Sequence, residues 1–165
     1  MFFDRDGVIN VNHGYVHTRE AFDWIEGAAA AVKAVNDSGR WAFLITNQAG
    51  VARGYYDEAA IATLHAWVQQ TLAEQGAHFD DIRYCPHHPE GVAPGYAQRC
   101  DCRKPAPGMI LDLMAHWPVD PARSGVIGDK DSDLAAGAAA GLQGLLFTGG
   151  NLKDAVEVLL GRIGG

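Results

Sequence analysis

Polar residues that could carry out chemistry gather in four short clusters, and three of these clusters follow an apolar run. In the first cluster Asp4 and Asp6 follow Met1 to Phe3, and Gly7 permits a turn directly after them. Two carboxylates at this spacing can hold Mg²⁺ through one or two oxygens, while water and a substrate phosphate take the ion's other positions. A solvated acidic turn has the same local sequence, so this cluster alone leaves both interpretations open.

The other three clusters offer groups that could bind a phosphate or complete a metal site. Thr46 adds a hydroxyl to the successive amides of residues 46–50, which could cradle a phosphate, although Thr-Asn after a strand is also ordinary turn chemistry. Arg103 and Lys104 form a basic pair beside a loop rich in proline and cysteine. The last cluster has three carboxylates that could bind a cation, directly or through water, or cap the next helix: Asp129, Asp131 and Asp133.

A further set of residues has the spacing of a metal-binding loop. Three cysteines and one histidine form two pairs, each with one intervening residue: Cys85 with His87, and Cys100 with Cys102. Three thiolates and one imidazole make the closed four-coordinate site that structural Zn²⁺ prefers. Residues 85–108 also hold five of the seven prolines, which exclude regular helix and central strand. We therefore expect zinc to order this loop and to fix the backbone that aims Arg103 and Lys104.

The elements that must position these clusters follow a regular alternation. Short apolar runs predict strands at 1–3, 41–45, 82–84, 125–127 and 145–147. Longer patterns with capping residues predict helices at 28–36, 57–74, 107–117, 131–140 and 152–160. Such alternation is typical of a parallel sheet wrapped by helices, whose ligands bind beyond the carboxyl ends of the strands. We therefore expect the clusters to meet at one edge of the sheet.

The four clusters, in this order and at separate strand ends, resemble the haloacid dehalogenase superfamily of phosphotransferases over nearly the whole chain. The resemblance implies an α/β fold with a doubly wound, mostly parallel, Rossmann-like sheet and no large cap domain. It implies that Asp4 attacks phosphorus to form an aspartyl-phosphate, and that Asp6 protonates the leaving oxygen and then activates water. Thr46 and Lys104 would bind the phosphoryl oxygens. Asp129 would hold Mg²⁺ together with Asp4 and the backbone carbonyl of Asp6.

The cysteine loop narrows the resemblance to two groups within the superfamily. Segments 13–17, 46–54, 85–89 and 100–105 are similar to the D-glycero-D-manno-heptose 1,7-bisphosphate phosphatases almost residue for residue. The histidinol-phosphate phosphatases are a more distant match, because their gap between the two ligand pairs is usually shorter. The closer group implies hydrolysis of the C7 phosphate, with histidinol phosphate as the alternative substrate.

By the same resemblance, substrate would contact nine residues: Asn12, His13, Gly14, Tyr15, Asn47, Gln48, Ala49, Arg103 and Lys130. Arg103 is the best candidate for a second, distal phosphate because a guanidinium can grip two oxygens. Residues 13–17 could also form a flap that shields the site from water.

Composition excludes several other classes of protein. The 165 residues predict one domain spanning 1–165, and a net charge of −7 without a basic run argues against a nucleic-acid partner. The sequence has no apolar stretch of about 18 residues that could span a membrane. Three cysteines and an acidic residue close to the start predict a cytoplasmic protein with reduced thiols. We expect a monomer whose partner is a small phosphorylated sugar.

The start of the chain departs from the superfamily pattern. Only three residues precede Asp4, whereas the superfamily has a longer first strand. We therefore expect the start to be truncated or misassigned, and an upstream extension to raise the melting temperature.

Two different classes of function share part of this pattern. A receiver-like signalling domain also has Asp, Thr and Lys at strand ends, but its acidic pair would stand apart from the phosphoryl acceptor and it would need no cysteine loop. A non-catalytic, zinc-stabilised interaction module would account for the loop. Against that class, every catalytic position is filled in this sequence.

Overall fold

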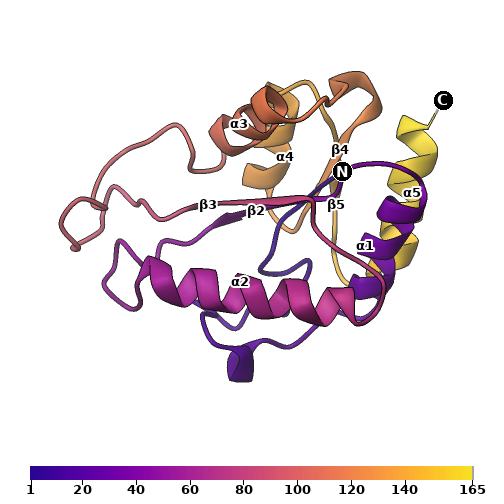
Figure 1. Cartoon of the computed structure of the whole chain (residues 1–165). Helices are drawn as coiled ribbons and strands as arrows, with labels where there is room; N and C mark the ends of the chain where they lie inside the picture. Colours follow the sequence, from indigo (N-terminus) through magenta and orange to yellow (C-terminus); the bar gives the residue numbers. More distant parts are fainter. Residues whose placement is uncertain (165) are drawn as a thin grey trace.

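A five-stranded sheet lies between two layers of helices in the computed structural model, which describes residues 1–164 (Figure 1). The strands are β1 (Phe2–Phe3), β2 (Phe43–Asn47), β3 (Asp81–Cys85), β4 (Gly125–Gly128) and β5 (Gln143–Leu146). Their order across the sheet is β3-β2-β1-β4-β5, and every neighbouring pair is parallel. The carboxyl ends of all five strands therefore lie at one edge, and the predicted doubly wound sheet is confirmed.

The helices divide between the two faces of the sheet. They are α1 (Ala28–Asp37), α2 (Glu58–Ala73), α3 (Gly108–His116), α4 (Asp131–Ala139) and α5 (Leu152–Ile163), with 3₁₀ turns at Arg19–Ala21 and Pro121–Arg123. Figure 1 shows α2 on the side of the sheet opposite to α3 and α4. The helices and strands begin and end within three residues of the predicted bounds. Among residues 1–164, none of the helices is both long enough and apolar enough to cross a membrane.

Alternating side chains along the strands fill two separate cores. Phe2 and Phe43 pack toward α3 and α4, whereas Phe3 and Leu44 pack toward α1, α2 and α5, and all four are fully buried. Successive side chains of a strand point to opposite faces, so a sheet covered on both faces needs continuous apolar runs. This need explains why β1 consists of two phenylalanines. The strand is held on both sides, since Phe2 is paired with Phe43 of β2 and with Val126 of β4.

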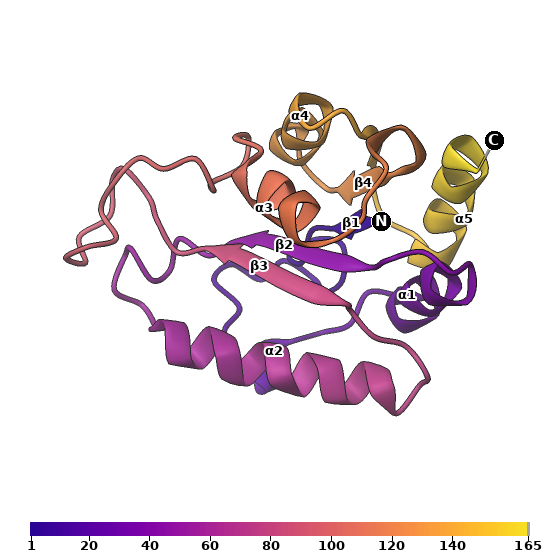
Figure 2. The ribbon, with the colours of Figure 1, turned by 45° about the horizontal axis from the view of Figure 1, so that its top comes forward.

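Three loops extend beyond the carboxyl edge of the sheet, after β1, β2 and β3. Figure 2 shows the loop after β3, residues 86–107, reaching outward from the end of that strand. It has no helix or strand of its own, as its prolines predict. It is anchored instead by the amides of Val92 and Ala93, which both donate to the Ala52 carbonyl at 2.7 and 2.9 Å. The Tyr96 hydroxyl adds a 2.6 Å hydrogen bond to Glu58 at the start of α2.

Candidate active site and cysteine cluster

The ends of β1, β2 and β4 bring the predicted polar clusters together. Asp4 directly follows β1, Thr46 is the second-to-last residue of β2, and Asp129 directly follows β4. Lys104 reaches the same point from the long loop, and its ammonium Nζ lies 2.6 Å from Asp4 Oδ1 and 3.1 Å from the Ile45 carbonyl. The expectation that the clusters meet at one edge is therefore correct.

Lys104 is shared between two carboxylates. Its Nζ also lies 2.7 Å from Oδ1 of Asp133 on α4, and all three side chains are at least nine-tenths buried. Burial alone would lower the pKa of Lys104, but the charges of Asp4 and Asp133 outweigh that effect and raise it. The lysine is therefore held as a cation between the two carboxylates.

Asp4, Asp129 and Asp133 form a group that fits a divalent cation. Each offers one carboxylate oxygen, and these oxygens all lie within 4.8 Å of one another. Burial raises the pKa of both Asp4 and Asp129, and the buried Oδ1 of Asp129 has no hydrogen-bond partner in the protein. One ammonium among three carboxylates leaves negative charge without compensation, and a hard cation with oxygen ligands would supply it. The Asp6 carboxylate lies outside this group.

The Asp6 carboxylate is fixed by hydrogen bonds from three side chains. Arg5 Nη2 donates to both of its oxygens at 3.1 Å, and Asn10 Nδ2 and Gln48 Nε2 each donate at 3.0 Å. The Asp6 side chain nevertheless remains 18% exposed. It is therefore a positioned carboxylate that is still open to the cavity beside Asp4.

Gln48 links Asp6 to Thr46, and Tyr56 sets its orientation. The Tyr56 hydroxyl donates to Gln48 Oε1 at 2.6 Å, so Gln48 Nε2 faces Asp6 and also donates to Thr46 Oγ1 at 2.8 Å. Burial raises the pKa of Tyr56 to about 12, which keeps its hydroxyl protonated as the donor. Because the Thr46 hydroxyl accepts this bond, its own hydrogen is free for another acceptor. The sequence did not point to Asn10 or Tyr56, since neither belongs to a motif.

A cavity of about 240 Å³ lies at the carboxyl edge of the sheet, and neither Thr46 nor Asp129 is among the residues that line it. Its walls include Asp4, Asp6, Lys104, Asp133 and Tyr56, together with eight of the nine predicted substrate residues: Asn12, Gly14, Tyr15, Asn47, Gln48, Ala49, Arg103 and Lys130. His13 is the exception. Its ring lies outside the cavity lining and pairs instead with the Asp23 carboxylate at 2.6 Å.

Asn47 has a second role that the sequence did not indicate. Its side-chain amide donates to the Lys104 carbonyl at 3.1 Å and accepts from the Lys104 amide at 3.0 Å. These two bonds fix the backbone that carries the buried ammonium. Asn47 is thus engaged within the protein even though it lines the cavity.

Residues 13–17, which we call the flap, lie against the loop after β2. The ring of Tyr15 packs edge-to-face on Tyr55 with 4.8 Å between centroids, and His17 stacks on Tyr56 at 4.5 Å. Aromatic pairs of this geometry are attractive beyond the area they bury. The flap therefore closes one side of the cavity, as the predicted shielding role requires.

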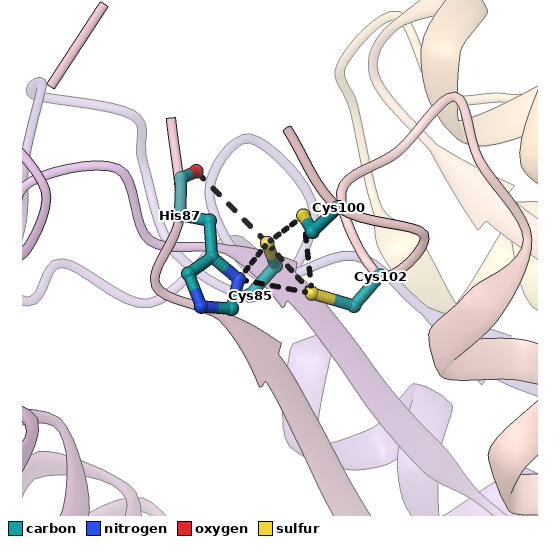
Figure 3. A group of neighbouring side chains, drawn as sticks. All are labelled: Cys85, His87, Cys100 and Cys102. Atoms are coloured by element: carbon teal, nitrogen blue, oxygen red, sulfur yellow. Dashed lines mark hydrogen bonds between the residues drawn. The ribbon is translucent and has the colours of Figure 1, made fainter. Parts of the chain in front are cut away.

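The three cysteines and His87 converge on one point, as Figure 3 shows. The three sulfur atoms lie 3.0 to 3.5 Å apart, and His87 Nδ1 lies 3.8 Å from Cys85 Sγ and 3.5 Å from Cys102 Sγ. The cysteines are free thiols, and the four donor atoms fit a closed four-coordinate metal site. Because Cys85 ends β3 and Cys102 is two residues before Lys104, the cluster connects the sheet to the buried lysine.

Comparisons with known proteins agree with this geometry. A family described as HAD-hydrolase-like matches residues 101–159. D-glycero-β-D-manno-heptose-1,7-bisphosphate 7-phosphatase of Rhodopseudomonas palustris is 51% identical over 159 residues, covering 96% of this chain and 88% of that protein. The enzyme of the same name from Escherichia coli K12 is 44% identical, covering 95% and 83%. A D,D-heptose 1,7-bisphosphate phosphatase from B. bronchiseptica, solved with magnesium and phosphate, has a TM-score of 0.81 and 33% identity, covering 96% and 85%.

Proposed function

Because this chain belongs to the D-glycero-β-D-manno-heptose-1,7-bisphosphate 7-phosphatase family of HAD-like hydrolases, we propose that it removes the C7 phosphate from that bisphosphate. The observation that carries the proposal is the cavity onto which Asp4, Asp6 and Lys104 open together. One carboxylate there is paired with a buried ammonium, and the other is held by neutral and cationic donors. Two carboxylates in such different surroundings can take different parts in one reaction.

In the first half of the reaction Asp4 is the nucleophile. Its carboxylate oxygen attacks phosphorus while the bond from phosphorus to the sugar oxygen breaks, and the sugar oxygen takes a proton from Asp6. The products are the free sugar alcohol and an aspartyl-phosphate on Asp4. Lys104 offsets the repulsion between the carboxylate and the phosphate, and the free hydrogen of the Thr46 hydroxyl is available to a phosphoryl oxygen.

In the second half Asp6 acts as a base. Its carboxylate takes a proton from water as the water oxygen attacks phosphorus, and the bond from phosphorus to Asp4 breaks. Inorganic phosphate leaves, Asp4 is free again, and Asp6 carries the proton for the next cycle. Asp4, Asp129 and the Asp6 carbonyl would hold Mg²⁺, which supplies charge neutralisation at the phosphate when it is bound. Asp133 belongs to the same group of three carboxylates and forms an ion pair with Lys104.

The cations at the cavity wall are assigned to the rest of the substrate. Arg103 lines the cavity, and its buried Nη1 has no hydrogen-bond partner in the protein, so it is suited to the distal C1 phosphate. Lys130, Asn12 and the flap residues Gly14 and Tyr15 would contact the sugar. The names of the relatives favour the β anomer at C1.

The remaining proposals concern the chain as a whole. Cys85, His87, Cys100 and Cys102 would hold Zn²⁺ in a structural role, because four protein donors would leave no open position for substrate. The chain acts as one domain over residues 1–165, as a cytoplasmic monomer on a small phosphorylated sugar, without nucleic-acid or membrane partners. The net charge of −7 and the free thiols support these assignments.

Phosphate release with Mg²⁺ present tests the proposed function. The substrates are the two anomers of heptose 1,7-bisphosphate and histidinol phosphate, and the variants are Asp4→Asn and Asp131→Asn. Asp131 is the matched control because it is an exposed carboxylate in the first turn of α4. We expect the β anomer to be preferred, Asp4→Asn to lose turnover by at least about 10³-fold, and Asp131→Asn to keep it.

Each alternative has its own result. Preference for histidinol phosphate would keep the mechanism and overturn the substrate assignment. Turnover that survives in Asp4→Asn would overturn the nucleophile, and an inactive wild-type protein that binds both metals would favour the non-catalytic interaction module.

A further inference from the structure

Arg5 is a fully buried arginine for which the reaction described above has no role. It lies between Asp4 and Asp6 in the sequence, and its side chain is 0% exposed. A buried guanidinium is costly unless it is paired and hydrogen-bonded. Among residues 1–164 its one carboxylate contact is Asp6, both of whose oxygens accept from Nη2 at 3.1 Å. The positive charge of Arg5 therefore pairs with Asp6, the proposed acid and base.

The second terminal nitrogen of Arg5 contacts an unusual partner. Nη1 lies 3.2 Å from Nε2 of His65, which comes from the middle of α2 and is 6% exposed. A guanidinium can only donate, so Nε2 of His65 must accept and the ring must be neutral with its proton on Nδ1. Burial and the charge of Arg5 lower the pKa of His65 to about 3, in agreement with a neutral ring.

Arg5 also contacts the flap. Nη2 donates to the Val16 carbonyl at 2.5 Å, so the same guanidinium holds the Asp6 carboxylate and the flap backbone. The planar fork has a fixed geometry, and its orientation is set from the other side by His65. The three contacts place α2, the flap and Asp6 in one hydrogen-bonded chain.

We propose that Arg5 and His65 are positioning residues, with His65 orienting the Arg5 guanidinium and Arg5 holding the Asp6 carboxylate in line with the sugar oxygen. This inference rests on the proposed function, because it takes Asp6 as the acid and base. Proton transfer needs a heavy-atom distance of about 3 Å, and a displacement of about 1 Å can cost about 100-fold in rate. Asn10 and Gln48 would still contact Asp6 without Arg5, but neither carries charge.

Three variants of α2 test this role without touching the reacting groups. His65→Leu removes the acceptor, whereas His65→Gln retains one in the oxygen of its amide. Leu72→Ala is the control for stability, since it opens a cavity in the buried face of the same helix far from Asp6 in sequence. The measurements are kcat, KM and the melting temperature, with heptose 1,7-bisphosphate as substrate and Mg²⁺ and Zn²⁺ present.

We expect His65→Leu to lower kcat by about 10- to 100-fold, with KM changed by less than about threefold, and His65→Gln to recover most of the loss. Leu72→Ala should lower the melting temperature and leave kcat per folded molecule unchanged. A loss in His65→Leu no larger than in Leu72→Ala would overturn the inference. So would equal losses in the leucine and glutamine variants.

Failure of the proposed function would be seen separately in the wild type. If the wild-type protein prefers histidinol phosphate or p-nitrophenyl phosphate, the substrate assignment fails and the same variants are compared on the preferred compound. If Asp4→Asn leaves turnover intact, the mechanism fails, and the positioning role fails with it.

Discussion

At the scale of single residues, the candidate site groups three carboxylates with one buried ammonium. Asp4 and Asp133 share the ammonium of Lys104 at 2.6 and 2.7 Å, and Asp129 adds a third carboxylate nearby. Buried carboxylates that outnumber their cations repel one another and hold a site ready for a further positive charge. A phosphate dianion can enter only if that charge is present. The arrangement therefore links cation binding to substrate binding, with Lys104 as the part supplied by the protein.

The neutral state of His65 predicts how stability depends on pH. Its pKa in the folded protein is lowered from 6.5 to about 3, so between these values the unfolded chain binds a proton that the folded protein does not. The contribution is fully present above about pH 6.5 and is lost as pH falls. We expect the wild type to lose about 2 kcal/mol relative to His65→Gln between about pH 6.5 and about pH 5.

Urea unfolding of both proteins over this pH range, with metals retained, measures the difference. His116→Gln is the control, because that ring is 61% exposed. Parallel stability curves for the wild type and His65→Gln would contradict a neutral buried imidazole.

The backbone at Gly7 leaves no room for a side chain, so we expect Gly7→Ala to lower activity. Its φ is +95°, and a Cβ at this position would collide with the Asp129 carboxylate. Gly39 has a similar φ of +72° but open space around a Cβ. Both alanine variants should lose about 1–2 kcal/mol of stability from the left-handed backbone. Only Gly7→Ala should also lower kcat or apparent Mg²⁺ affinity, by about 10-fold or more, because it displaces a proposed ligand. Equal activity of the two variants in a Mg²⁺ titration would count against Asp129.

At the scale of elements, the sequence predicted what local patterns control. The two phenylalanines of β1 and the apolar run of β2 are buried on both faces, and such runs are visible in a sequence. β5 begins two residues before its predicted start, because the exposed Gln143 and the small Gly144 hide the strand pattern. The motif residues Asp4, Thr46 and Asp129 come together because parallel strands share one edge, and Lys104 joins them from the loop after β3.

The contacts between loops could not be predicted in the same way. Tyr56 orients Gln48 across eight residues, and Asn47 holds Lys104 across 57 residues. These pairs depend on how two loops of irregular backbone pack, and neither helical nor strand periodicity reports on that packing. The predicted position of His13 shows the same limit, since its ring pairs with Asp23 in another irregular segment, ten residues along the chain.

The cysteine cluster predicts a local response to metal removal. It joins the end of β3 to the backbone before Lys104, and residues 86–107 have no helix or strand to replace it. We expect a zinc chelator, followed by excess Mg²⁺, to speed amide exchange in residues 86–103 while α5 stays protected. Activity should fall by about 10-fold or more, and added Zn²⁺ should restore it. Full activity in zinc-free protein would show that the loop positions Lys104 without the metal.

At the scale of the whole molecule, an acidic protein binds an anion by local means. The net charge is −7, yet Arg103, Lys104 and Lys130 all line the cavity of about 240 Å³. The cations act at short range, and the buried Lys104 is screened by salt less than a surface charge. No large cap domain covers the cavity among residues 1–164, so residues at the ends of the strands and on the loops that follow them form its walls. Selection of a small sugar phosphate therefore falls to side chains on those loops.

The surface predicts that the protein works as a monomer. The large apolar side chains that are exposed among residues 1–164 lie on several loops and elements: Tyr15, Trp41, Tyr55, Val92, Leu111, Leu146 and Val158. Of these, Tyr15 and Tyr55 pack on each other. A stable dimer usually buries at least about 1,200 Å² of well-packed surface, which scattered side chains do not provide. Light scattering should therefore give the chain mass of 17.7 kDa. Activity per molecule should be constant from nanomolar to micromolar protein, and a fall on dilution together with a doubled mass would instead require a site completed by a second copy.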